Sequence, residues 1–99
     1  MDNKLTTWIS SSFAPNIETK IKNYFSKICL LNEEDFTDIP KGFSFLYDED
    51  SNAASPIHIT FEEQGDTHFI QITGEYDWEV VNAYTKVQSL IVDIVEGAA

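Results

Sequence analysis

The sequence contains two histidines, and these are the first side chains to consider for acid–base catalysis or metal binding. His58 and His68 lie in two neighbouring segments that alternate apolar and polar residues, which is the pattern of half-buried β-strands. With a two-residue turn at Gln64-Gly65, His58 points away from the core and His68 points into it. No Cys or third His lies at a zinc-like spacing from them. We therefore predict ordinary packing for both histidines, with no metal site and no cofactor.

A lone cysteine and one acidic cluster are the other candidates for chemistry. Cys29 closes the apolar stripe of a predicted helix, and the local sequence Ile28-Cys29-Leu30-Leu31 supplies no base or positive charge that would activate a thiolate. The sequence Asp48-Glu49-Asp50-Ser51-Asn52 resembles a calcium loop, yet it lacks the central Gly and the bidentate Glu at position twelve. The sequence contains no Gly-rich phosphate loop and no nucleophile elbow. We predict that the protein is not an enzyme.

Hydrophobic periodicity predicts the helices that would position these residues. Two long amphipathic helices are expected, over 16–29 and 78–95, because apolar residues recur in each at spacings of three and four. The second is rich in β-branched residues, which favours a strand, but residues 89–95 do not alternate apolar with polar, so the helix is retained. A short N-terminal helix is expected over 3–12, where Leu5, Trp8 and Ile9 stand at helical spacing.

Three strands are expected between the long helices, over 43–48, 57–62 and 67–73, whereas 32–42 reads as an acidic connector. A turn at Gln64-Gly65 sets Ile59 opposite Ile70, and it places the aliphatic residues of these strands on one face. The predicted fold class is α+β. It is a two-layer sandwich in which a three-stranded antiparallel sheet is packed by the two helices, in a single domain over 1–99.

Charge is the unusual property of this chain. The formal net charge is −11, and every one of the six basic residues is a lysine. Residues 28–79 carry thirteen acids against Lys41 alone, whereas residues 1–27 are slightly basic. A chain without arginine is poorly equipped to bind phosphates bidentately, and the sign of its field disfavours nucleic acids and anionic membranes. No apolar run is long enough for a membrane span, there is no signal-peptide pattern, and a single cysteine suits a reducing compartment. We expect a cytoplasmic protein with a basic protein partner.

The acidic residues of this middle region are the candidate partner-binding residues, and aromatic residues interleave with them. Aromatic anchors within a charged rim are how tight interfaces concentrate their binding energy. The alternative is an acidic surface that only keeps a small protein soluble. The predicted partner-binding set is Glu33, Glu34, Asp35, Asp38, Tyr47, Asp48, Glu49, Asp50, Glu62, Glu63 and Asp66.

Two functional hypotheses follow from this pattern. The first is an acidic inhibitor that neutralises a basic, nucleic-acid-acting protein by occlusion; by analogy of class, bacterial or phage immunity proteins, antitoxins and nucleic-acid mimics share this size and charge. The alternative is a small dimeric adaptor like a secretion chaperone. Self-association discriminates between them, because a chaperone should dimerise through its helix or outer sheet face, whereas the inhibitor could be a monomer or a homodimer.

Overall fold

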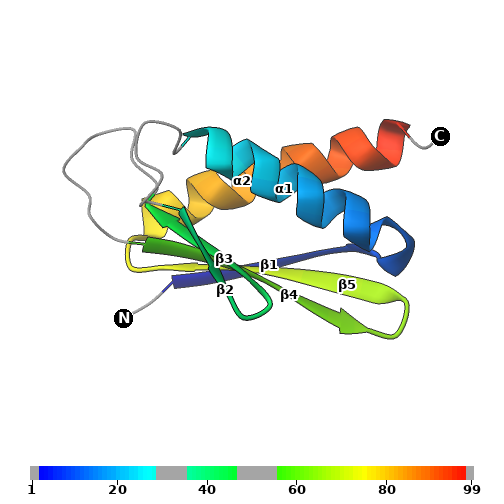
Figure 1. Cartoon of the computed structure of the whole chain (residues 1–99), viewed down its shortest axis with the longest axis horizontal. Coiled ribbons are helices and arrows are strands. Elements are labelled where there is room, and N and C mark those ends of the chain that lie inside the picture. The colour runs from blue at the N-terminus through cyan, green and yellow to red at the C-terminus, as the bar shows by residue number, and fades with distance from the viewer. Residues whose placement is uncertain (1–2, 29–35, 47–55, 98–99) are drawn as a thin grey trace.

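The structure is a computed structural model that describes residues 3–28, 36–46 and 56–97, and its class is α+β. A five-stranded antiparallel sheet carries two long helices (Figure 1). In chain order the elements are β1 (Asn3–Ser10), the 3-10 helix η1 (Ser11–Phe13), α1 (Ala14–Ile28), β2 (Phe36–Ile39), β3 (Gly42–Leu46), β4 (Pro56–Gln64), β5 (Thr67–Gly74) and α2 (Asp77–Gly97).

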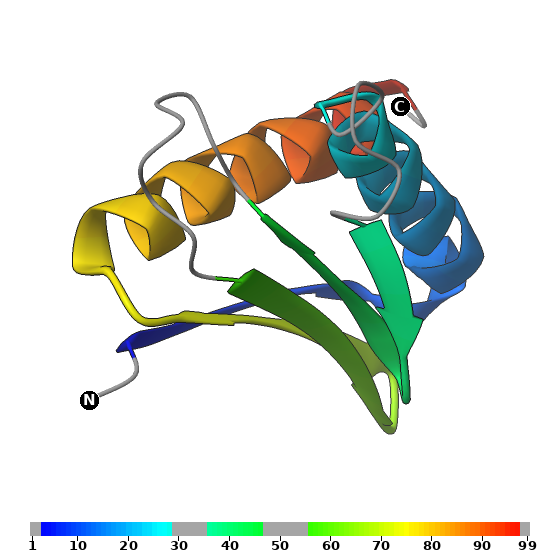
Figure 2. The same cartoon turned by 60° about the vertical axis from the view of Figure 1, so that its left-hand side comes forward.

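The strands are ordered β1-β5-β4-β3-β2, so the first strand lies beside the last one and forms one edge of the sheet. Both helices lie on the same face of the sheet, and they run in opposite directions across it (Figures 1 and 2). The other face of the sheet is covered by no helix in the described part of the chain. This arrangement confirms the predicted layering of helices on one face of an antiparallel sheet.

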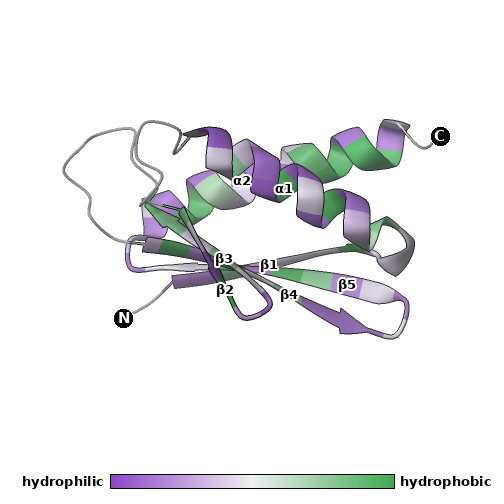
Figure 3. Cartoon of the chain, viewed as in Figure 1, coloured by the Kyte–Doolittle hydropathy of each residue, from purple (hydrophilic) through white to green (hydrophobic). Residues whose placement is uncertain are grey.

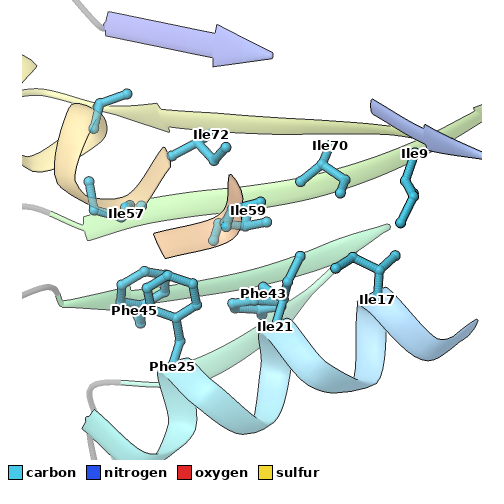
Figure 4. Close-up of a cluster of buried hydrophobic side chains, with 13 residues drawn as sticks. Ile9, Ile17, Ile21, Phe25, Phe43, Phe45, Ile57, Ile59, Ile70 and Ile72 are labelled. Atoms are coloured by element: carbon cyan, nitrogen blue, oxygen red, sulfur yellow. The ribbon is translucent and has the colours of Figure 1, made fainter. Parts of the chain in front are cut away.

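The core lies between the sheet and the helices. Ile17, Ile21 and Phe25 are fully buried on α1, and they recur every four residues as the amphipathic pattern requires (Figure 4). On the sheet, every second residue is buried along β3, β5 and the first half of β4, as expected for strands with one face on the core. The rings of Phe25 and Phe45 stack with their centroids 4.4 Å apart. The buried hydrophobic cluster comprises Ile9, Ile17, Ile21, Phe25, Phe43, Phe45, Ile57, Ile59, Ile70, Ile72, Val80, Ala83 and Val87.

The predicted N-terminal helix over 3–12 is wrong, because these residues form strand β1 and the start of η1. β1 pairs along its whole length with β5, from Asn3 opposite Gly74 to Ser10 opposite Thr67. Its inner face is buried at Ile9, whereas Trp8 points outward and is 64% exposed. The sequence imitated a helix because Trp8 is a large apolar residue on the outer face of the strand, next to the buried Ile9.

The predicted sheet also lacked β2, which lies within the segment expected to be a connector. Phe36 pairs with Phe45, and its ring stacks on Phe43 at a centroid distance of 5.2 Å. Pro40 and Lys41 form the turn into β3, and Lys41 takes a positive φ of 64°. Two of the residues predicted for the strand over 43–48, Tyr47 and Asp48, lie outside the described residues.

The predicted pairing of Ile59 with Ile70 is wrong by two residues, since Ile59 lies opposite Ile72. The turn consists of Gly65 and Asp66, and Gly65 has a φ of +61°, the conformation that a type II′ hairpin requires at its first central position. A shift of two residues preserves the faces of both strands. Both predicted side-chain directions are therefore confirmed: His68 is 4% exposed on the inner face, and His58 lies on the outer face.

The two long helices are confirmed, with ends that differ from the prediction by up to two residues. α1 begins at Ala14 rather than residue 16, with Pro15 in its first turn, where a missing N–H costs no hydrogen bond. α2 begins at Asp77 and ends at Gly97. In the described part of the chain, neither helix is long and apolar enough to cross a membrane. Cys29 lies outside the described residues, so its predicted burial stays a prediction.

Candidate partner-binding surface

Four of the eleven predicted partner-binding residues lie in the part of the chain that the structure describes, and seven lie outside it. Asp38 is exposed on edge strand β2, and its Oδ1 lies 3.0 Å from Nζ of Lys22 on α1. This ion pair is half-exposed at Lys22 and 71% exposed at Asp38, so it contributes little to stability. The predicted residues outside the described ranges are Glu33, Glu34, Asp35, Tyr47, Asp48, Glu49 and Asp50.

The remaining predicted residues, Glu62, Glu63 and Asp66, are exposed at the tip of the β4–β5 hairpin. Asp66 holds this tip against the chain that follows β1, because its carbonyl oxygen accepts a hydrogen bond of 2.8 Å from the Ser11 N–H. At the same end of β4, the Phe61 N–H donates to the Lys41 carbonyl at 2.8 Å, so the backbone of a lysine lies near this end of the hairpin. The hairpin tip is therefore acidic, but its surroundings are of mixed charge.

A cavity of about 340 Å³ shows the same mixture of charges. Lys22 and Lys41 contribute positive charge to its wall, Glu18 and Asp38 contribute negative charge, and Phe61 lies among them. Opposite charges at such short range compensate one another, so this cavity offers no net field to a charged partner.

Behind this cavity lies the buried histidine. Nε2 of His68 lies 3.2 Å from Oε1 of Glu18, and the ring stacks on Phe61 at a centroid distance of 5.6 Å. The distance is that of an ion pair, yet neither ring nitrogen makes a well-aligned hydrogen bond to the described residues. No group of three His, Cys, Asp or Glu residues there is placed to hold a metal ion. His68 therefore packs at the rim of the core between the Glu18 carboxylate and the Phe61 ring.

The start of α2 is where described acids and exposed aromatic rings coincide. Glu75, Tyr76, Asp77 and Trp78 follow one another at the junction of β5 and α2, and we call them the α2-start surface. Tyr76 is 44% exposed and Trp78 is 49% exposed, which is unusual for such large apolar side chains. Glu75 and Asp77 are exposed beside them. Acidic charge is also stable here, because a helix N-terminus carries partial positive charge.

The backbone of this junction is held in place by local hydrogen bonds. The side-chain amide of Asn3 on β1 donates to the Glu75 carbonyl at 3.1 Å. The Val80 N–H donates to the Tyr76 carbonyl at 3.2 Å, which starts the helix. Val80 and Ala83 are fully buried, so the start of the helix is anchored in the core while the side chains before Glu79 face outward. A fixed backbone of this kind presents the two rings at little entropic cost on binding.

The described residues that flank the two undescribed acidic segments lie at this same end of the fold. Ile28 ends α1 and Phe36 begins β2, on either side of Glu33-Glu34-Asp35 in the sequence. Leu46 ends β3 and lies opposite Pro56, which begins β4, on either side of Asp48-Glu49-Asp50. In Figure 1 these ends lie toward the same end of the long axis as the start of α2, whereas Figure 2 separates the end of α1 and the start of β2 from it. The ends that flank Glu33-Glu34-Asp35 therefore lie across the sheet from the α2-start surface, because β2 is the edge strand opposite β1.

Sequence reasoning missed Glu75 and Asp77 as candidate residues. The signal was present, because acidic and aromatic residues alternate over 75–78 and this run stands between a strand pattern and a helix pattern. A junction of that kind places consecutive side chains at the surface.

Comparison of the chain with protein-family models, with curated proteins and with solved structures found no match. The residues of this chain therefore carry the functional inference.

Proposed function

We propose that the protein is an acidic inhibitor that binds a basic, nucleic-acid-acting protein in the cytoplasm and occludes its nucleic-acid site. The α2-start surface supports this proposal, because it combines two exposed aromatic rings with two exposed carboxylates on a fixed backbone. Buried aromatic residues are the commonest energetic centres of protein interfaces, and carboxylates around them select a cationic partner.

The charge of the whole molecule supports the same class of partner. A net charge of −11 on 99 residues produces a field that attracts basic proteins and repels nucleic acids. Electrostatic steering raises the association rate, and it weakens as salt shortens the reach of each charge to about 8 Å at physiological ionic strength. The aromatic rings would lower the dissociation rate, because their contacts with the partner must break before the complex separates.

Matched charge variants at the two ends of α2 test this proposal. The test pair is Glu75→Gln with Asp77→Asn, and the control pair is Asp93→Asn with Glu96→Gln, which neutralises the same number of exposed carboxylates at the other end of the helix. The probes are a lysine-rich peptide and a purified basic nuclease, with binding followed by surface plasmon resonance and inhibition by nucleic-acid cleavage. The test pair should slow association more than the control pair, and Trp78→Ala should speed dissociation.

Equal effects of the two pairs would show that only net charge matters, and the α2-start surface would then have no special role. Failure of the parent protein to inhibit any basic nuclease while still binding the lysine-rich peptide would remove the inhibitor mechanism. The alternative function, a small chaperone-like adaptor, would then be preferred, since the long open edge of β1 described below favours a dimer.

A further inference from the structure

The two edges of the sheet differ in how well they are protected against pairing with another strand. β2 is four residues long, carries the exposed Asp38 and ends beside Pro40, all of which discourage strand addition. β1 is eight residues long, contains no proline, and has Lys4 as its one charged residue. In the described part of the chain β1 pairs only with β5, so its other side is open. Long open edges of this kind are sites of strand pairing.

The register identifies which backbone groups of β1 are open. The Ser11 N–H donates to the Asp66 carbonyl, and this pair continues the β1–β5 register. In an antiparallel ladder the hydrogen-bonded pairs alternate, so the odd-numbered residues of β1 direct their N–H and C=O groups toward β5. The even-numbered ones, Lys4, Thr6, Trp8 and Ser10, direct theirs away from the sheet. These groups would form the hydrogen bonds to an added strand.

An apolar flank of α2 lies along the same edge. Val81, Val92 and Val95 are 43%, 50% and 46% exposed, and with Gln88 they recur along one side of the helix. Gln88 locates this side, because its Oε1 accepts a hydrogen bond of 2.7 Å from Oγ1 of Thr7 on β1. Figure 3 shows the hydrophobic colour that continues along the second half of α2. The flank from Val81 to Val95 spans about 21 Å, comparable with the length of about 27 Å of an eight-residue strand.

The distribution of charge favours a second copy of this chain as the molecule that binds the open edge of β1 and the flank of α2. With a net charge of −11, two copies repel one another, so they can approach only where acidic residues are scarce. β1 contains no acidic residue, the flank positions Val81, Gln88, Val92 and Val95 carry no charge, and Lys4 adds a positive charge; Asp93 and Glu96 are the acids nearest to the flank in the sequence. Each copy also supplies both of the elements that the surface needs, an open strand edge and an apolar helix flank beside it. An identical surface on both partners is what a two-fold interface requires.

We propose that the protein forms a two-fold symmetric homodimer in which β1 pairs antiparallel with β1 of a second copy, and the apolar flanks of the two α2 helices lie together above the joined strands. The pairing must match even-numbered residues with even-numbered ones, because these carry the open N–H and C=O groups. When Thr6 lies opposite Thr6, Lys4 of each copy lies opposite Trp8 of the other on the outer face. That register places an ammonium group beside an exposed indole, a favourable cation–π arrangement.

Mass measurement and two interface variants test the dimer. Sedimentation velocity over total concentrations from about 1 μM to about 1 mM covers the dissociation constants of weak and moderate complexes. Thr6→Pro removes an N–H that the monomer does not use, and edge strands tolerate proline at such a position. Val92→Glu places a charge in the apolar flank, and Ser89→Glu adds the same charge on an exposed position away from it. Circular dichroism verifies that each variant is folded.

The parent protein and Ser89→Glu should sediment as dimers, and Thr6→Pro and Val92→Glu should raise the dissociation constant at least about tenfold. Hydrogen exchange supplies a local readout: the amides of Thr6 and Trp8 should exchange slowly at concentrations that give a dimer and rapidly at those that give a monomer. A parent protein that stays monomeric at about 1 mM overturns the proposal. A dimer that both variants leave intact, or in which these amides exchange rapidly, overturns it as well. If Thr6→Pro does not fold, Val92→Glu with the amide exchange decides alone.

Discussion

Replacing Ile59 by alanine should strongly destabilise the protein, because this side chain lies at the centre of the core. Ile59 is fully buried on β4, between Phe43 on β3 and Ile72 on β5. The substitution removes Cγ1, Cγ2 and Cδ1, and each carbon contributes about 0.8 kcal/mol of transfer free energy when buried. A residual cavity of about 60 Å³ would add about 1.5 kcal/mol. The expected loss in the free energy of unfolding is therefore about 4 kcal/mol, a large share of the stability of a domain of this size.

Urea unfolding followed by circular dichroism measures this loss. With a dependence of about 1.5 kcal/mol per molar urea, the midpoint should fall by about 2.5 M. Protein concentration must be held fixed across the variants, because a dimer makes the apparent stability depend on concentration. Ile59→Val, which removes Cδ1 alone, should cost about 0.5–1.5 kcal/mol.

Thr60→Ala is the matched control, since Thr60 is the next residue on the same strand and points to the outer face. Its expected cost is below about 1 kcal/mol, as for other substitutions outside the core. If Ile59→Ala cost no more than Thr60→Ala, the inner and outer faces of β4 would be reversed, and the layering of the helices over this sheet would be refuted.

Gly42→Ala tests the contact between strands β3 and β4, and Thr7→Val tests the contact between β1 and α2. Gly42→Ala should cost about 3 kcal/mol or more, because a Cβ at this position would overlap the carbonyl oxygen of Ile59 and approach Cα of Thr60 to 2.9 Å. Gly97→Ala meets nothing within 4 Å and should leave the urea midpoint nearly unchanged; equal midpoints for the two alanine variants would disprove the close approach of β3 to β4. Thr7→Val should cost about 1 kcal/mol through loss of the hydroxyl that donates to Gln88. Adding Gln88→Leu should then cost less than Gln88→Leu alone, because only the hydrogen bond from the Gln88 amide to the Tyr84 hydroxyl is left to lose. Strictly additive losses in this double-mutant cycle would show that the two side chains do not interact.

The elements that could be predicted from the sequence are those whose hydrophobic pattern is long or strictly alternating. The stripe of α1 through Ile17, Ile21 and Phe25 gave an unambiguous helix, and the alternation along β4 and β5 gave the inner and outer faces. The pairing register was missed by two residues because Gly65 was placed at the second central position of the turn. A glycine followed by a residue such as Asp66 satisfies a type II′ turn when the glycine comes first.

β1 could not be recognised from local spacing alone. Leu5, Trp8 and Ile9 fit one side of a helix, and the same residues also fit a strand whose outer face bears one large apolar side chain. The β-branched pair Thr6-Thr7 favours the strand. What decides the structure is the pairing of β1 with β5, whose residues lie 57 to 71 positions further along the chain. No local pattern reports a contact of that sequence separation.

The sequence predicted that acidic residues would bind a partner, but it did not locate the surface at the start of α2. An excess of acids in the middle of the chain indicated a basic partner, yet Asp38 of β2 pairs with Lys22 of α1, and Glu18 and Lys41 line the same cavity as this pair. Only the fold shows that Glu75 and Asp77 are exposed beside two exposed rings. The charge pattern therefore predicts a class of partner, and the topology shows which described acids lie beside exposed rings.

The two proposed surfaces adjoin each other but can be separated by experiment. Asn3, at the start of β1, binds the carbonyl of Glu75, so the α2-start surface lies at the first end of the proposed dimer strand. In an antiparallel pair the first end of one strand lies beside the last end of the other, which places the two α2-start surfaces at opposite ends of the dimer. A dimer would then hold two partner molecules, or bind two sites of one partner with increased avidity. The Glu75→Gln, Asp77→Asn variant should remain dimeric while its association with the lysine-rich peptide slows, whereas Thr6→Pro should become monomeric and retain the association rate of a single site. Loss of both properties in both variants would mean that the two surfaces are one and that the division drawn between them is wrong.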